Sequence, residues 1–123
     1  MADGDFNAPW NHLLRIAESE WTRLHAELPA DVRAAIAGVA VLFEEFPDRN
    51  DLDPDLLGFF EGSPAGETET GLPGRITLWL GNLWDFSNAQ EAVFRDETRI
   101  TLLHEIGHAL GWDEDEIAAR GLA

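Results

Sequence analysis

The chain of 123 residues contains no cysteine and no tyrosine. Without cysteine it forms neither a disulfide framework nor a thiolate zinc site, so any metal must be held by histidine, aspartate and glutamate. Without tyrosine it has no phenol that could donate a hydrogen bond to a developing oxyanion. The length is typical of one domain, which we expect to span residues 1–123.

Basic residues are also scarce: the chain has 8 of them against 24 acidic ones, for a net charge of −16. This charge opposes binding to nucleic acids and to anionic membranes, and we expect neither as a partner. The main interpretation of this charge is that it keeps the protein soluble. A second interpretation is that it favours neutral or basic substrates. The longest apolar run, Ile36 to Phe43, is too short to span a bilayer. The segment MADGDFNAPW shows no signal peptide, so we expect a cytoplasmic protein.

Hydrophobic periodicity predicts a small α+β domain with N-terminal helices, three strands and a central helix. We expect the three strands to form one small mixed sheet. Helices are expected at 9–27, at 31–37, from about 87 to 110, and at 115–120. Strands are expected at 39–43, 56–62 and 75–82. The first helix carries an apolar stripe at steps of four or seven residues, made of Leu13, Ala17, Leu24 and Leu28.

The long central helix is expected to begin near Ser87, which together with Gln90 could form a capping box. It could be interrupted near Asp96. Gly111 is expected to end it, because glycine readily adopts the left-handed conformation that closes many helices. The segment 63–74 between the second and third strands is polar and glycine-rich, which is typical of a loop.

The central helix contains the segment HEIGH, in which His104 and His108 are four residues apart and share one face. Two imidazoles on one face of a helix can coordinate a single metal ion. Glu105 lies about 100° round the helix, beside the ion, where it can take a proton from a water on the metal. Glu97 and Thr101 continue the polar face, while most of the remaining circumference is apolar. This pattern predicts a buried helix with one polar stripe lining a cleft.

A hydrolytic zinc ion takes three protein ligands and keeps one position open. Gly111 permits a sharp turn that could return the following residues to the metal, and three carboxylates follow it at once. Glu114 is the favoured third ligand, Asp113 the runner-up and Asp115 the third choice. Imidazole and carboxylate suit Zn²⁺ first, although the same ligands also bind manganese, iron and nickel.

The segment TLLHEIGHALGWDEDEI (101–117) resembles the small bacterial zincin-like metallopeptidases, also called minimal zincins. The segment LPGRITLWLGNLW resembles the Pro-x-x-Ile-x-Leu strand of that family, and the likeness extends over roughly residues 30–122. The resemblance implies a helix carrying His104, Glu105 and His108, with the third ligand at the position of Glu114.

The pattern H-E-x-x-H-x-x-G is also similar to the start of the metzincin motif. Metzincins place a third histidine where Glu114 stands here, and they have a methionine turn below the metal. The only methionine of this chain is Met1, so the chain is not a full metzincin.

These observations predict a zinc-dependent metallopeptidase that hydrolyses peptide bonds in a peptide or protein substrate. Glu105 is its expected general base. In zincins generally, a strand before the site helix forms the upper rim of the cleft and pairs with substrate. The strand 75–82 is expected to take that role here, with Arg75, Thr77, Trp79 and Asn82 as candidate substrate contacts. Arg75 or Asn82 could also replace the missing tyrosine at the oxyanion.

A second hypothesis is a module of zincin fold, weakly active or inactive, that binds metal or protein. Tryptophan-rich surfaces are typical of protein interfaces. The five tryptophans that could supply such a surface are Trp10, Trp21, Trp79, Trp84 and Trp112.

Overall fold

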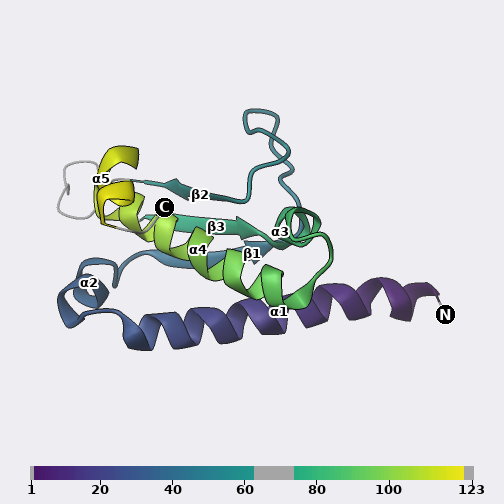
Figure 1. The fold of residues 1–123 in the computed structure, drawn as a ribbon. Coiled ribbons are helices and arrows are strands. Elements are labelled where there is room, and N and C mark those ends of the chain that lie inside the picture. Colours follow the sequence, from purple (N-terminus) through teal and green to yellow (C-terminus); the bar gives the residue numbers. More distant parts are fainter. Residues whose placement is uncertain (1, 63–73, 121–123) are drawn as a thin grey trace.

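The computed structural model describes residues 2–62 and 74–120, in which five helices accompany a three-stranded mixed sheet (Figure 1). The predicted α+β class is therefore confirmed. In chain order the elements are α1 (Ala2–Glu27), α2 (Ala30–Ala35), β1 (Ala40–Glu44), β2 (Gly58–Glu61), β3 (Arg75–Trp79), α3 (Leu80–Phe86), α4 (Glu91–Ala109) and α5 (Glu114–Ala119). Among the described residues, no helix is both long and apolar enough to cross a membrane.

The sheet has the strand order β1-β3-β2, so the last strand in sequence is the middle one. β3 runs parallel to β1, with Ala40 opposite Arg75, and antiparallel to β2, with Gly58 opposite Leu78. Both hydrogen-bonding edges of β3 are therefore engaged. Within the part of the chain that the structure describes, β2 pairs only with β3 and keeps its other edge free.

The central helix α4 packs against β2, β3, α1 and α3, and crosses in front of the sheet in Figure 1. The predicted apolar stripe is confirmed, because its three residues on α1 and Leu28, which directly follows α1, are all buried. A continuous core joins α1, the sheet, α3 and α4; its buried members are Leu13, Ile16, Ala17, Leu24, Leu28, Ile36, Ile76, Leu78, Leu80, Leu83, Phe94, Leu102, Ile106 and Ala109.

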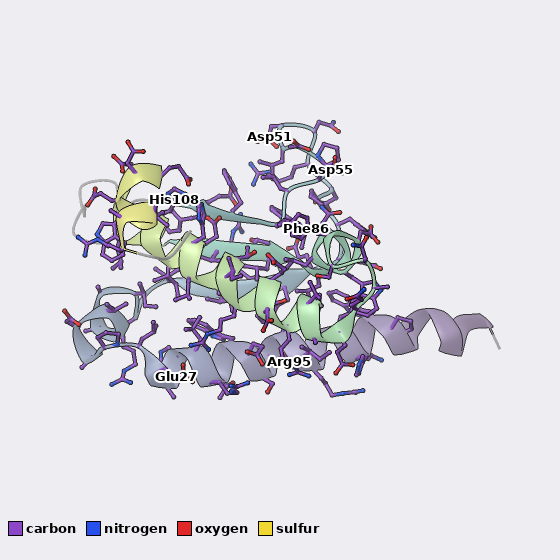
Figure 2. All side chains as sticks on the ribbon, in the orientation of Figure 1. Glu27, Asp51, Asp55, Phe86, Arg95 and His108 are labelled. Carbon is purple, nitrogen blue, oxygen red and sulfur yellow. The ribbon has the colours of Figure 1, made fainter. Side chains whose placement is uncertain are left out.

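Among the described residues, three ion pairs join α4 to α1, and one of them is that of His12 with Glu91. Arg95 reaches the buried carboxylate of Glu20 at 3.3 Å, and Arg99 pairs with Glu27. Figure 2 labels Arg95 and Glu27 along this seam. The ion pairs and the core together hold α4 rigidly, and a rigid helix is the support that a metal site needs.

The predicted strand 75–82 is wrong in its second half, because β3 ends at Trp79 and α3 begins at Leu80. The alternation of Ile76, Leu78 and Leu80 resembles a strand throughout. Leu80 and Leu83 are three residues apart and both fully buried, which is the spacing of a helix. The helical spacing prevails because both leucines enter the core.

The boundaries of the predicted helices also differ from the observed ones. The expected capping box is wrong: the Ser87 hydroxyl donates to the Leu83 carbonyl at 2.7 Å and closes α3, while Gln90 caps α4 without a side-chain bond. α4 is continuous through Asp96. α1 begins at Ala2 rather than at residue 9. The predicted loop 63–74 lies almost wholly outside the described residues.

Candidate metal centre

The HEIGH segment lies in the C-terminal half of α4 and points its polar groups into one cleft. His104, Glu105 and His108 each offer a ligand atom, and these atoms all lie within 4.8 Å of one another. The two imidazole rings stand edge to face with centroids 4.9 Å apart. Both histidines are half-buried and line the cleft.

The chain reverses direction immediately after α4. Gly111 has φ of +89°, its N–H donates to the His108 carbonyl, and the N–H of Trp112 donates to the Gly107 carbonyl. These two bonds define a Schellman motif, which needs a left-handed residue at this position. The prediction that Gly111 ends the helix is confirmed, and the turn carries the next residues back towards the histidines.

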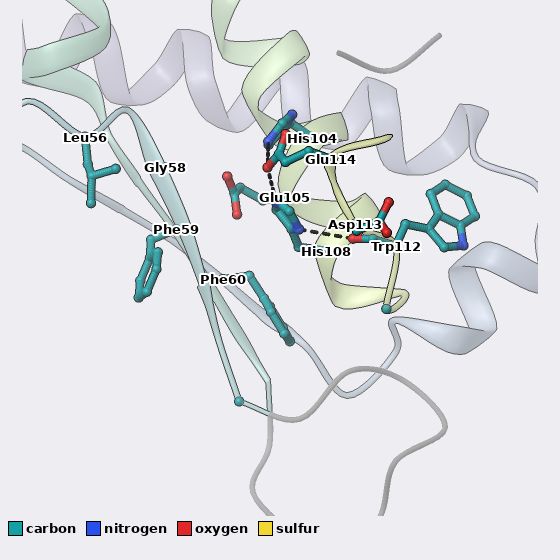
Figure 3. A pocket seen from close by; sticks show the side chains of 12 residues that line it. Leu56, Gly58, Phe59, Phe60, His104, Glu105, His108, Trp112, Asp113 and Glu114 are labelled. Atoms are coloured by element: carbon teal, nitrogen blue, oxygen red, sulfur yellow. Dashed lines mark hydrogen bonds and ion pairs between the residues drawn. The ribbon is translucent and has the colours of Figure 1, made fainter. Parts of the chain in front are cut away.

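Glu114, the first residue of α5, meets both histidines. Its Oε2 lies 3.1 Å from Nε2 of His104 and 2.8 Å from Nε2 of His108 (Figure 3). Donor atoms at the corners of a tetrahedron around zinc, with bonds of about 2.0–2.1 Å, lie roughly 3.3 Å apart. The distances from Oε2 of Glu114 to the two histidine nitrogens are therefore close to the spacing that one zinc ion would impose.

The other two candidate ligands, Asp113 and Asp115, form no hydrogen bond with the histidines. The Asp113 carboxylate accepts the backbone N–H of Glu116 at 2.8 Å and caps α5, so its side chain is committed to starting that helix. Asp115 is exposed and does not line the cleft. Of the three carboxylates after Gly111, the structure brings only that of Glu114 to both histidines.

The histidine tautomer also suits a metal. Nδ1 of His108 lies 3.2 Å from the carbonyl oxygen of Trp112, so this nitrogen carries the proton and donates. Nε2, on the other side of the ring, lies 2.8 Å from Oε2 of Glu114, and it would offer its lone pair to a metal ion that replaced this contact. A hydrogen bond of this kind orients metal-binding histidines in proteins generally.

Glu105 is buried beside the histidines, with 7% of its surface exposed. Burial raises the pKa of its carboxyl group, and the charges of His108 and His104 oppose the rise in part. The nearby backbone of Phe60 in β2 also opposes the rise of this pKa, as the smallest of these contributions. A glutamate with a raised pKa is better matched to proton transfer near neutral pH than an ordinary surface glutamate.

The three donors and Glu105 lie at the floor of an open cleft of about 620 Å³ (Figure 3). β2 and the residues around it form one wall, and the turn from α4 to α5 forms the other. At Gly58, β2 lies very close to α4: a Cβ atom there would lie 2.7 Å from Cγ2 of Thr101 and 3.3 Å from Cγ of Glu105. Only glycine allows the strand to approach the helix so closely.

The residues predicted to contact substrate do not line this cleft. Thr77 and Trp79 are buried, Arg75 pairs with Glu61 at 2.9 Å, and the Asn82 amide donates to the carbonyls of Pro54 and Leu56. The expectation that 75–82 pairs with substrate is wrong, because β3 already pairs on both sides.

The strand beside the cleft is β2, to which the sequence pattern assigns no functional role. Leu56, Gly58, Phe59 and Phe60 line the cleft from this side. One signal is present in the segment LLGFFEG: a glycine inside an apolar strand often marks a close backbone approach.

Comparisons with known proteins identify the family to which the chain belongs. A sequence model described as zincin-like metallopeptidase matches residues 36–122, so the chain belongs to that family. A search of curated proteins found no match. Among solved structures, a conserved hypothetical protein from Thermus thermophilus is similar, with 26% identity and a TM-score of 0.54 over 90% of this chain and 98% of that one. The family and the fold are thereby established.

Proposed function

We propose that the protein is a zinc-dependent peptidase in which Glu105 is the general base. The observation that carries this proposal is the convergence of three neutral or anionic donors on one point, with a buried carboxylate beside them in an open cleft. His104, His108 and Glu114 would hold the metal.

The donor set fits zinc on chemical grounds. Two imidazoles and one carboxylate are a common ligand set of hydrolytic zinc, and they leave a net charge of +1 on the ion. When bound, zinc would polarise a carbonyl group and lower the pKa of water. The Glu105 carboxylate would accept a proton from the attacking water and return it to the leaving amine nitrogen.

The free edge of β2 offers a place for an extended substrate. A peptide added to that edge would bond to the backbone of β2 and pass over the histidines, since β2 and α4 form the two sides of the cleft. This proposal replaces the role expected for residues 75–82. Peptides and proteins, rather than nucleic acids, are the proposed substrates.

Stabilisation of the oxyanion is the weak part of the site. The chain has no tyrosine, and the two residues expected to substitute for it are engaged elsewhere, Arg75 with Glu61 and Asn82 with two carbonyls. Loss of one such donor typically slows catalysis about 10²- to 10³-fold. We therefore propose a slow turnover or a narrow range of substrates.

The test compares zinc-loaded wild type with Glu105→Gln on a library of unstructured peptides, with cleavage products read by mass spectrometry. Wild type is expected to cleave a subset, and Glu105→Gln to lose cleavage while retaining about one zinc per chain. Glu116→Gln is the matched control, because this exposed residue of α5 lies outside the cleft. Cleavage by Glu105→Gln at the wild-type rate would refute the proposed role of Glu105.

A zincin-fold module without useful catalysis is the second candidate, favoured by the absence of an oxyanion donor. Tryptophan does not supply it with a surface: Trp79 is buried, and Trp10, Trp21 and Trp84 pack against the core. Trp112 lines the cleft and carries the Arg120 guanidinium 4.0 Å above its ring. Zinc binding by wild type without cleavage of any peptide would favour this candidate.

A further inference from the structure

A second cavity of about 320 Å³ opens beside the metal centre, along the N-terminal side of His104. We call it the side pocket. It shares Leu56, Gly58, His104 and Glu105 with the cleft, so the two spaces adjoin at the reacting centre. The residues that line only the side pocket are Leu57, Glu97, Ile100 and Thr101.

The walls of the side pocket are mainly apolar. Leu56 and Leu57 come from the segment before β2, and Ile100 comes from α4 and is 43% exposed. An exposed isoleucine beside a cavity is available for contact with a ligand. These side chains would pack against an aliphatic stem of several methylene groups.

Glu97 is the one charged residue of the side pocket that does not belong to the HEIGH segment. Glu97, Thr101 and His104 are spaced four and three residues apart on α4 and share one face. Seven residues of helix put the Glu97 backbone about 10 Å from that of His104. The carboxylate therefore lies towards the far end of the pocket from the metal position.

Glu97 is half-buried and has no hydrogen bond or ion pair with any other residue that the structure describes. The comparison with Glu91 on the same helix is direct, because Glu91 pairs with both His12 and Arg95. A half-buried carboxylate without a cation loses hydration and gains no partner, so a cationic group entering the pocket would be favoured there.

We propose that the side pocket receives a lysine or arginine side chain of the substrate, at a residue close to the scissile bond, and that Glu97 selects it. The proposal rests on the proposed peptidase function. The stem of such a side chain would cover Leu56, Leu57 and Ile100, and its cation would meet Glu97. The net charge of −16 would draw basic peptides towards the protein as well.

Other side chains fit the pocket less well. A leucine or phenylalanine would cover the apolar walls and would also desolvate the Glu97 carboxylate without giving it a partner. A glutamate would be repelled. The expected order of preference is therefore basic, then apolar, then acidic.

The test measures binding, so that it does not depend on turnover. Zinc-loaded Glu105→Gln protein is titrated with capped alanine hexapeptides that carry one arginine, leucine or glutamate at each position in turn. At one position arginine is expected to bind about fivefold more tightly than leucine, the upper range for a partly exposed ion pair. The preference should shrink as salt is added.

The variant Glu97→Gln, made in the same Glu105→Gln background, is expected to reduce the arginine preference to less than about twofold. Asp96→Asn is the matched control: it removes the same charge one residue away, from an exposed position that does not line the pocket. It should keep the full preference. An arginine preference that survives in Glu97→Gln, or a preference for leucine at every position, would overturn the proposal.

The same peptides then separate this proposal from the proposed activity. If arginine binds selectively through Glu97 but wild type cleaves none of the peptides, the side pocket stands and the peptidase assignment fails. If peptides are cleaved with no dependence on Glu97, the peptidase assignment stands and the side pocket fails.

Discussion

Replacing Gly107 with alanine is expected to push α5 away from α4 and to move the Glu114 carboxylate with it. A Cβ at Gly107 would lie 2.7 Å from Cγ1 and 3.0 Å from Cδ1 of Ile117, whereas carbon atoms in contact prefer about 3.5–4.0 Å. Ile117 is fully buried and is the only buried residue of α5, so it fixes the position of that helix. The glycine of HEIGH therefore has a packing role.

The magnitude follows from two opposed terms. Overpacking costs about 1–3 kcal/mol, while alanine stabilises a helix interior by about 1 kcal/mol relative to glycine. Gly107→Ala should thus destabilise the metal-free protein by roughly 0–2 kcal/mol. Displacement of Glu114 should weaken zinc binding by about tenfold or more, as is typical when the support of a ligand is lost.

A double-mutant cycle with Ile117→Ala tests this reasoning. That substitution costs about 2–5 kcal/mol alone, but it also removes the atoms with which the methyl group added at position 107 would collide. The double variant should be more stable than the sum of the single effects by about 1–3 kcal/mol, measured by urea unfolding. Additive effects within about 0.5 kcal/mol, together with an unchanged zinc affinity for Gly107→Ala, would refute the argument.

Three further predictions concern the walls of the cleft and the turn after α4. Gly58→Ala should lower both the stability of the protein and its rate of peptide cleavage, because the added Cβ would collide with Thr101. Urea unfolding measures the first effect and a peptide assay the second, and wild-type values in both would contradict the prediction. Gly111→Ala should lower the free energy of unfolding by about 1–2 kcal/mol, because alanine is strained at this positive φ, and it should weaken zinc binding. Calorimetry measures both quantities, and wild-type values for both would contradict the prediction. Hydrogen bonds from Arg49, and to a lesser extent from Arg75, lower the pKa of the Glu61 carboxyl group in the folded protein. The ionised Glu61 therefore stabilises the fold above its unfolded pKa near 4.5, and this stabilisation is lost as the pH falls through the lower pKa of the folded state. Glu61→Gln should therefore be less stable than wild type at pH 7, by at most about 1 kcal/mol, and equally stable near pH 2; a difference that persisted in acid would contradict this.

The site helix was predictable from sequence because local geometry decides it. The spacing of His104, Glu105 and His108 fixes their relation on any α-helix, whatever surrounds it. Gly111 indicated the turn, since few other residues adopt the left-handed conformation required there. Both features are determined within about one helical turn.

The substrate side of the cleft could not be predicted in the same way. Its geometry depends on which strand occupies the middle of the sheet. The order of the strands is decided by contacts between segments that are far apart in sequence. In sequence, β3 is the strand nearest to α4, and only α3 lies between them. Nevertheless, β2 is the strand that keeps a free edge beside the histidines. The short helix α3 was missed for a related reason, because Leu80 satisfies both a strand and a helix pattern.

The central claim is that His104, His108 and Glu114 together hold one zinc ion. The most direct test is zinc stoichiometry by elemental analysis at neutral pH, after loading and removal of excess metal. Wild type should retain about one zinc per chain, and Glu114→Ala clearly less under the same dialysis. A wild-type chain that retains no zinc, or a Glu114→Ala variant that retains as much as wild type, would contradict the account.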